Sequence, residues 1–242
     1  MNCFYDESKP LVFDNDGSKV FLESVVNELL KRGYNPRDLE DFKKGTLDLF
    51  KVEHINAPKD PRGIMFLATH VSDLDAVLFS FYYEAMNILS KQEWTENDVL
   101  MNFLKQYFNF IGISREKDGS DIAELKKLLG PLKNGENCLI FTPGTITDVK
   151  MNSKERMLGA AYLGLSERYD TRLVISEYPS MESTRYYYSD RIVVPTRQSK
   201  EYYQEYILEA YLKLLEEMSP ACREPVLTYK HSNNNKSGDQ FF

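Results

Sequence analysis

A histidine and an aspartate five residues apart are the side chains whose types and spacing could do chemistry. His70 follows a short apolar run, residues 63–68, and Asp75 opens a longer stretch of apolar residues at helical spacing. A neutral imidazole can accept a proton from a hydroxyl group, while a neighbouring carboxylate fixes its tautomer and stabilises the imidazolium that forms. The pair therefore predicts a general base with the carboxylate that orients it. The alternative is that His70 is a partly buried histidine whose ring is satisfied by a helix-capping Asp75.

The elements on either side would hold this pair at the edge of a sheet. Residues 63–68 are predicted to form a buried strand and residues 74–90 a helix, so His70 lies at the carboxyl end of a strand. Open α/β sheets place their sites at such ends. Two further apolar runs, 110–115 and 138–141, are predicted strands that also end in polar or turn-forming residues.

Strands and helices alternate through the rest of the chain. The other predicted strands cover residues 173–175 and 192–194. The other predicted helices cover residues 96–108, 121–129, 153–167 and 201–218. This alternation predicts an α/β fold, a single domain whose largely parallel sheet is covered by helices on both faces. An α-hairpin precedes it: one helix spans 18–32, and a second begins at Asn35 with Pro36 as its first helical residue and ends near Phe50.

We expect four segments along the chain. They are a polar lead-in (1–17), the N-terminal helical hairpin (18–52), the α/β domain (53–228) and a disordered tail (229–242). The hairpin would cover the sheet or, alternatively, offer an apolar face to lipid.

Composition narrows the class of protein. With 242 residues, 42% of them hydrophobic, the chain can bury one sizeable core. A net charge of -7 argues against binding nucleic acid, which needs a basic face. Three widely spaced cysteines form no disulfide framework, and no apolar segment is long enough to span a bilayer. We therefore expect a cytoplasmic protein, with peripheral contact to a membrane left open. No metal is expected, because no ligand spacing joins His54 or His231, which lie in a polar segment before the strand and in the tail, to His70.

Three predicted strand ends, taken in order, resemble the motifs of the glycerolipid acyltransferase family, whose type member is the lysophosphatidate acyltransferase. The family's Asn-His-x-Ser-x-x-Asp is matched by residues 69–75 (THVSDLD), with Thr69 in place of Asn. Its Gly-x-Ile-x-Ile-x-Arg is similar to residues 110–115 (FIGISR), and its Phe-Pro-Glu-Gly-Thr-Arg-Ser to residues 141–147 (FTPGTIT). The resemblance covers residues 55–195.

The resemblance implies an activity in phospholipid metabolism. A fatty acyl group would move from a thioester, on coenzyme A or acyl carrier protein, to a hydroxyl of a glycerolipid-like acceptor. His70 would be the general base and Asp75 its orienter, with no cofactor besides the thioester substrate. The residues that the resemblance assigns to acceptor binding are Ser72, Arg115, Gly144 and Thr145.

Two of the departures from the third motif replace charged residues. Pro143 stands in place of the family's glutamate, and Ile146 in place of an arginine that holds the acceptor's phosphate. A charged hydrogen bond is worth about 1.5–3 kcal/mol, so its loss would weaken phosphate binding roughly tenfold to a hundredfold. The expected acceptor is therefore not a phosphomonoester.

Two other readings remain open. A serine hydrolase is one, since residues 112–116 (GISRE) begin like a nucleophile elbow but lack its closing glycine. The other is a non-catalytic acyl- or lipid-binding protein of the same fold with a decayed acceptor site. Against the second, His70, Ser72 and Asp75 are all present, and a passive binder has no chemical need for them.

Overall fold

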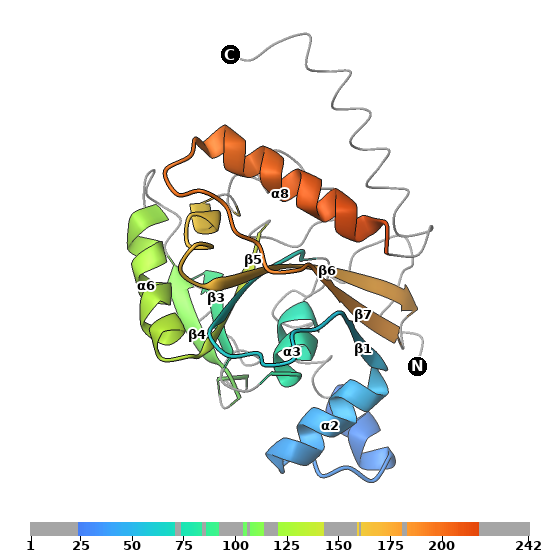
Figure 1. The fold of residues 1–242 in the computed structure, drawn as a ribbon. Helices are drawn as coiled ribbons and strands as arrows, with labels where there is room; N and C mark the ends of the chain where they lie inside the picture. The colour runs from blue at the N-terminus through green and yellow to red at the C-terminus, as the bar shows by residue number, and fades with distance from the viewer. Residues whose placement is uncertain are drawn as a thin grey trace, which may run out of the picture.

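The computed structural model describes residues 24–70, 74–83, 86–91, 104–105, 107–113, 121–142, 159, 161–180 and 183–217. Within these residues the strands are β1 (Val52–Ile55), β2 (Ile64–Ala68), β3 (Met86–Lys91), β4 (Asn109–Ile113), β5 (Asn137–Phe141), β6 (Asp170–Ser180) and β7 (Ser183–Tyr188). The labelled helices are α2 (Leu39–Leu49), α3 (Leu74–Phe81), α6 (Asp121–Lys133) and α8 (Lys200–Leu215), and another helix covers residues 24–31 (Figure 1).

The strands form one sheet in the order β1-β7-β6-β2-β5-β3-β4. β6, β2, β5, β3 and β4 run parallel to one another. β7 pairs antiparallel with β6, and β1 pairs parallel with β7, so these two strands at one side run in the opposite direction. The predicted α/β fold with a largely parallel sheet is confirmed.

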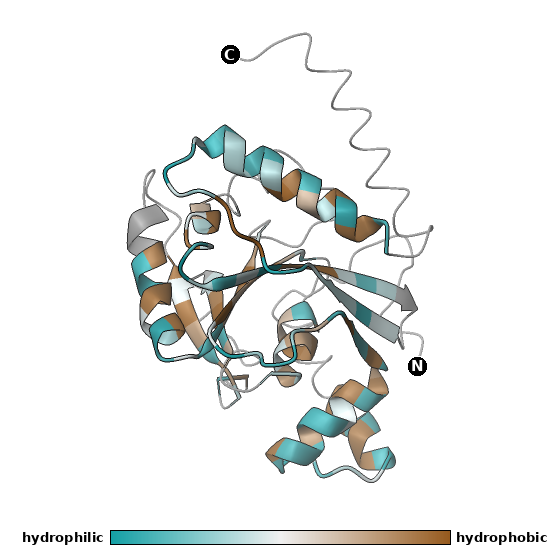
Figure 2. Ribbon diagram, in the orientation of Figure 1, coloured by the Kyte–Doolittle hydropathy of each residue, from teal (hydrophilic) through white to brown (hydrophobic). Residues whose placement is uncertain are grey.

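The central strand β2 contributes to hydrophobic cores on both faces of the sheet. Met65 and Leu67 pack in the core that contains residues of α6 and α8, while Phe66 and Ala68 pack in the core that contains residues of α2 and α3. This division follows from the two-residue repeat of a strand. α8 lies on one side of the sheet, with α2 and α3 on the other (Figure 1). Along α8, hydrophobic and hydrophilic residues both appear, as its half-buried position requires (Figure 2).

The helix predicted for residues 74–90 is wrong in its second half. α3 ends at Phe81, and Met86–Lys91 form β3, which pairs with both β5 and β4. Ile88, which lies within the predicted helix, is buried in this strand. A short apolar run fits a strand and a helix equally well. Here the run forms a strand because it lies between β5 and β4 and pairs with both.

The sheet also differs from prediction at one edge. β1 and β7 were not predicted, and residues 192–194 are not a strand, since Ile192 makes only an isolated bridge to Thr171. The sequence of β7, STRYYY, is polar in appearance, but three of its residues are tyrosines that the sheet buries. Tyrosine and threonine favour strands because their side chains pack well on a pleated surface.

The N-terminal hairpin is present, but its second helix starts later than predicted. Asp38, not Asn35, is the N-cap of α2, and its carboxylate accepts a hydrogen bond from the backbone N–H of Asp41. The two helices pack tightly, because a methyl group at Gly45 would lie 2.8 Å from atoms of both Leu29 and Tyr34. The predicted start of the first helix at residue 18 lies outside the described residues.

Other predicted boundaries shifted or fall outside the described part of the chain. α6 continues through Pro131 to Lys133 instead of ending at residue 129. α8 begins one residue early, after the N-cap Ser199. Most of the predicted helix 96–108 lies outside the described residues, as do residues 153–158 and 160, the lead-in 1–17 and the tail 229–242. Within the predicted helix 153–167, residues 159 and 161–163 are helical and residues 164–167 form turns.

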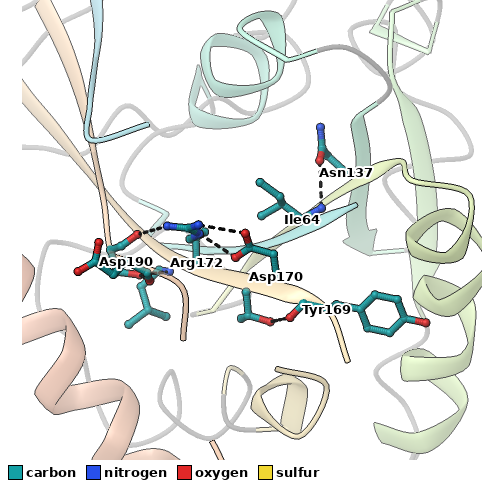
Figure 3. A network of polar contacts seen from close by, with 9 residues as sticks. Ile64, Asn137, Tyr169, Asp170, Arg172 and Asp190 are labelled. Carbon is teal, nitrogen blue, oxygen red and sulfur yellow. Dashed lines mark hydrogen bonds and ion pairs between the residues drawn. The ribbon is translucent and has the colours of Figure 1, made fainter. Parts of the chain in front are cut away.

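Buried and half-buried polar contacts secure the amino ends of the central strands (Figure 3). Asn137 at the start of β5 accepts a hydrogen bond from Ile64 N at 3.1 Å and donates one to the carbonyl of Pro61. On β6, Arg172 donates two hydrogen bonds to Asp170, at 2.8 and 3.0 Å. These contacts lie at the end of the strands opposite to His70 and fix where β2 and β6 begin.

Candidate active site

His70 and Asp75 are brought together at the carboxyl end of β2. His70 follows β2 by two residues, and Asp75 is the second residue of α3. The imidazole Nδ1 lies 3.4 Å from Asp75 Oδ2, and the two side chains are 12% and 1% exposed. With Nδ1 facing the carboxylate, Nε2 is the nitrogen left to accept a proton from another molecule. The predicted pairing is therefore present in the structure.

The backbone and ring of His70 are held by the strands on both sides of β2. The ring stacks on Phe141, the last residue of β5, with centroids 4.1 Å apart and planes at 18°. On the other side, Thr69 N donates to Val174 O at 3.0 Å, and Thr69 Oγ1 accepts from Ser176 N at 3.0 Å. The threonine that replaces the family's asparagine thus ties this segment to β6.

The end of β2 has further anchors on the α8 side. Thr142 donates to the carbonyl of Ala68 through both its N–H, at 2.9 Å, and its hydroxyl, at 3.1 Å. Tyr211 of α8 donates its hydroxyl to Leu67 O at 2.8 Å. Because Thr142 and Tyr211 are buried, these bonds hold the strand end rigidly, as a preorganised site requires.

A tyrosine that the sequence analysis missed also contacts Asp75. Tyr178 of β6 donates its hydroxyl to Asp75 Oδ1 at 2.5 Å. Burial, with the added effect of the Asp75 carboxylate, raises the pKa of Tyr178 well above its ordinary value, so the phenol stays a donor. The first turn of α3 also favours a negative charge, because backbone N–H dipoles point outward there. No local pattern marked Tyr178, since it lies beyond the predicted strand 173–175.

The residues assigned to acceptor binding are not placed by the structure. Ser72, Arg115, Gly144 and Thr145 lie outside the described residues, as do the departures Pro143 and Ile146. The described strands that lead to them are nevertheless informative. β2, β4 and β5 are parallel, so their carboxyl ends lie at one edge of the sheet. The described carboxyl ends of these three strands therefore lie at the same end of the sheet as His70.

His54 lies in a different setting from the one predicted. Instead of lying in a polar segment, it belongs to β1, where its ring stacks on Tyr82 at 3.6 Å and its Nδ1 lies 2.6 Å from Tyr188 Oη. Burial lowers the pKa of His54 from 6.5 to about 3. Among the residues that the structure describes, no three His, Cys, Asp or Glu side chains are grouped as they would be to hold a metal ion.

The family model described as Acyltransferase matches residues 49–167, which include both His70 and Asp75. The chain contains an acyltransferase domain. The resemblance seen in the three motifs is thereby confirmed at the level of the domain.

Solved structures also show similarity to the chain. A crystal structure of the 1-acyl-sn-glycerophosphate (LPA) acyltransferase PlsC from Thermotoga maritima is similar, with 17% sequence identity and a TM-score of 0.49. The match covers 82% of this chain and 92% of that one. A search among curated proteins found no match. None of the helices in the described ranges is both long and apolar enough to cross a membrane.

Proposed function

We propose that the protein transfers a fatty acyl group from a thioester to a hydroxyl of a lipid-like acceptor, with His70 as the general base. The observation that carries the proposal is the contact of His70 Nδ1 with the buried Asp75 carboxylate, which leaves Nε2 to receive the acceptor's proton. The thioester would be carried by coenzyme A or acyl carrier protein. Such a role belongs to lipid metabolism, in the cytoplasm or at a membrane surface.

The proposed reaction balances without any further reagent. His70 Nε2 removes the proton of the acceptor hydroxyl as its oxygen attacks the thioester carbonyl and forms the new carbon–oxygen bond. Asp75 stabilises the imidazolium that results. When the carbon–sulfur bond breaks, the imidazolium returns the proton to the departing thiolate. The products are an ester and a free thiol.

Measurement of thiol release tests this proposal. Replacement of His70 by Ala should lower the rate by about 10²–10⁴-fold, because a positioned general base contributes about that much. Asp75→Asn should have a comparable effect. His231→Ala, which removes a histidine elsewhere in the chain, is the matched control and should retain the parent rate. Equal thiol release by the parent, His70→Ala and Asp75→Asn would refute the assignment.

The changed third motif favours a second candidate, a non-catalytic acyl-binding protein. Pro143 and Ile146 replace two charged residues of the family motif, a loss that a passive binder would tolerate. The same assay separates the two candidates. A binder would gain thermal stability on addition of acyl thioester without releasing thiol.

For the acceptor, we propose an alcohol or amine on a molecule less anionic than a phosphomonoester. A phosphate dianion beside Ile146 would lose hydration without gaining a partner, and an unpaired buried charge costs several kcal/mol. Lysophosphatidate and glycerol 3-phosphate should therefore be poorer acceptors than non-phosphate lysolipids or amino alcohols. Ile146→Arg should narrow the difference, and Ile146→Leu is the control. Rapid turnover of lysophosphatidate by the parent would refute this preference.

A further inference from the structure

The two oxygens of the Asp75 carboxylate face two different side chains. Oδ2 lies 3.4 Å from His70 Nδ1, whereas Oδ1 accepts the 2.5 Å hydrogen bond from Tyr178. A carboxylate is planar and rigid, so a bond that holds Oδ1 also sets the direction of Oδ2. We infer that Tyr178 is a positioning residue for the proposed acyl transfer, acting through Asp75 on His70. The inference rests on the proposed function, because it concerns the same base.

The strand that carries Tyr178 is connected to His70 by a second route. Two residues earlier on β6, Ser176 donates its backbone N–H to Thr69 Oγ1 at 3.0 Å, and the two hydroxyl oxygens are 3.1 Å apart. Thr69 is the residue directly before His70. The contacts therefore close a ring through His70, Asp75, Tyr178, Ser176 and Thr69. In such a ring, β6 sets the position of the base and the direction of its orienter together.

The character of the bond also suits a positioning role. Asp75 is 1% exposed, so water cannot easily replace a lost donor at Oδ1. The donor is a neutral phenol, which orients the carboxylate without neutralising the negative charge that faces the imidazole. Without the hydroxyl, the carboxylate would lose the hydrogen bond that fixes Oδ1, and the direction in which Oδ2 faces His70 would be less well defined.

Tyr187 provides a matched comparison on the neighbouring strand β7. Its hydroxyl donates to Glu177 Oε2 at 2.6 Å, and Glu177, like Asp75, is almost completely buried. Tyr187 belongs to the core on the α8 side, whereas Tyr178 packs against the core on the α3 side. Replacement of either tyrosine by Phe thus removes one phenol-to-carboxylate bond, but only the carboxylate bound by Tyr178 faces the histidine.

The test is a double-mutant cycle measured by thiol release, with kcat and KM determined separately. Tyr178→Phe should lower kcat by about 10–100-fold, the range expected for a hydrogen bond to a charged group, and leave KM for the thioester nearly unchanged. In the Asp75→Asn background the same substitution should cause less than about threefold further loss, because residues that act as a unit are not additive. Tyr187→Phe should retain kcat within about threefold of the parent, whatever its melting temperature.

Three results would overturn the inference. The first is a kcat in Tyr178→Phe equal to that of the parent. The second is a loss of kcat from Tyr178→Phe that is as large in the Asp75→Asn background as in the parent. The third is a loss of kcat in Tyr187→Phe as large as that in Tyr178→Phe. If Tyr178→Phe alone does not fold, the double variant is compared with Asp75→Asn, and a further large loss there overturns the inference. A parent that releases no thiol would instead remove the proposed function and the inference together. An active parent with an unaffected Tyr178→Phe removes the inference alone.

Discussion

Acidification from pH 7 to pH 5 should destabilise the fold through His54. The imidazole of His54 stacks on Tyr82, with the ring centroids 3.6 Å apart and the planes at 16°, and Tyr186 lies 5.2 Å away. Its Nδ1 is 2.6 Å from Tyr188 Oη, while its buried Nε2 has no hydrogen-bond partner among the described residues. A proton on this ring would have to be carried without water. The folded protein therefore keeps His54 neutral.

The size of the effect follows from the pKa of His54, which burial lowers from 6.5 to about 3. Between these two values the unfolded chain binds a proton that the folded protein does not. The stabilisation is therefore complete above pH 6.5 and is lost as the pH falls below it. At about 1.4 kcal/mol per pH unit, the loss at pH 5 is roughly 2 kcal/mol. For a domain of this size that corresponds to a melting temperature lower by about 4–8 °C.

Urea unfolding followed by circular dichroism at pH 7 and pH 5 measures this contribution. His54→Phe keeps a planar ring against Tyr82 and cannot titrate. His54→Phe lacks the hydrogen bond to Tyr188 at both pH values. The cost of that loss cancels when the stability of the variant at pH 5 is compared with its stability at pH 7. The parent should lose about 2 kcal/mol more than His54→Phe between pH 7 and pH 5. His231→Phe, the control, should follow the parent. Identical pH dependence in the parent and His54→Phe would show that His54 is not held neutral.

Two further predictions concern stability. Asn137→Ala should lower the free energy of unfolding by about 2–3 kcal/mol, because it leaves the buried Ile64 N–H without its acceptor. Asp60→Ala, which removes an exposed acceptor of the exposed Arg62, should cost less than about 1 kcal/mol, and equal costs in urea unfolding would contradict this. Removal of residues 232–242 should change neither the melting temperature nor thiol release, because this segment has too little apolar surface to order itself. A melting temperature lower by many degrees would mean that Phe241 and Phe242 dock on the core.

The sequence by itself was sufficient for the pair of residues at the candidate site. Only five positions separate His70 from Asp75, and the boundary between a strand and a helix lies between them. Both elements are local, since the apolar run before His70 and the helical spacing after Asp75 can be read within a short window. The alternation of strands and helices likewise determined the fold class, because a parallel sheet needs crossover helices.

The tertiary structure decided which distant residues surround that pair. Tyr178 is 103 positions from Asp75 and reaches it because β6 is the neighbour of β2 in the sheet. The same applies to His54, whose segment appeared polar but pairs with β7, and whose ring is half-buried against aromatic rings. Strand order and edge pairing depend on contacts between segments far apart in the chain, which the periodicity of any one segment does not contain. Local patterns therefore indicated the proposed base and its proposed orienter, and only the assembled sheet revealed which distant residues contact them.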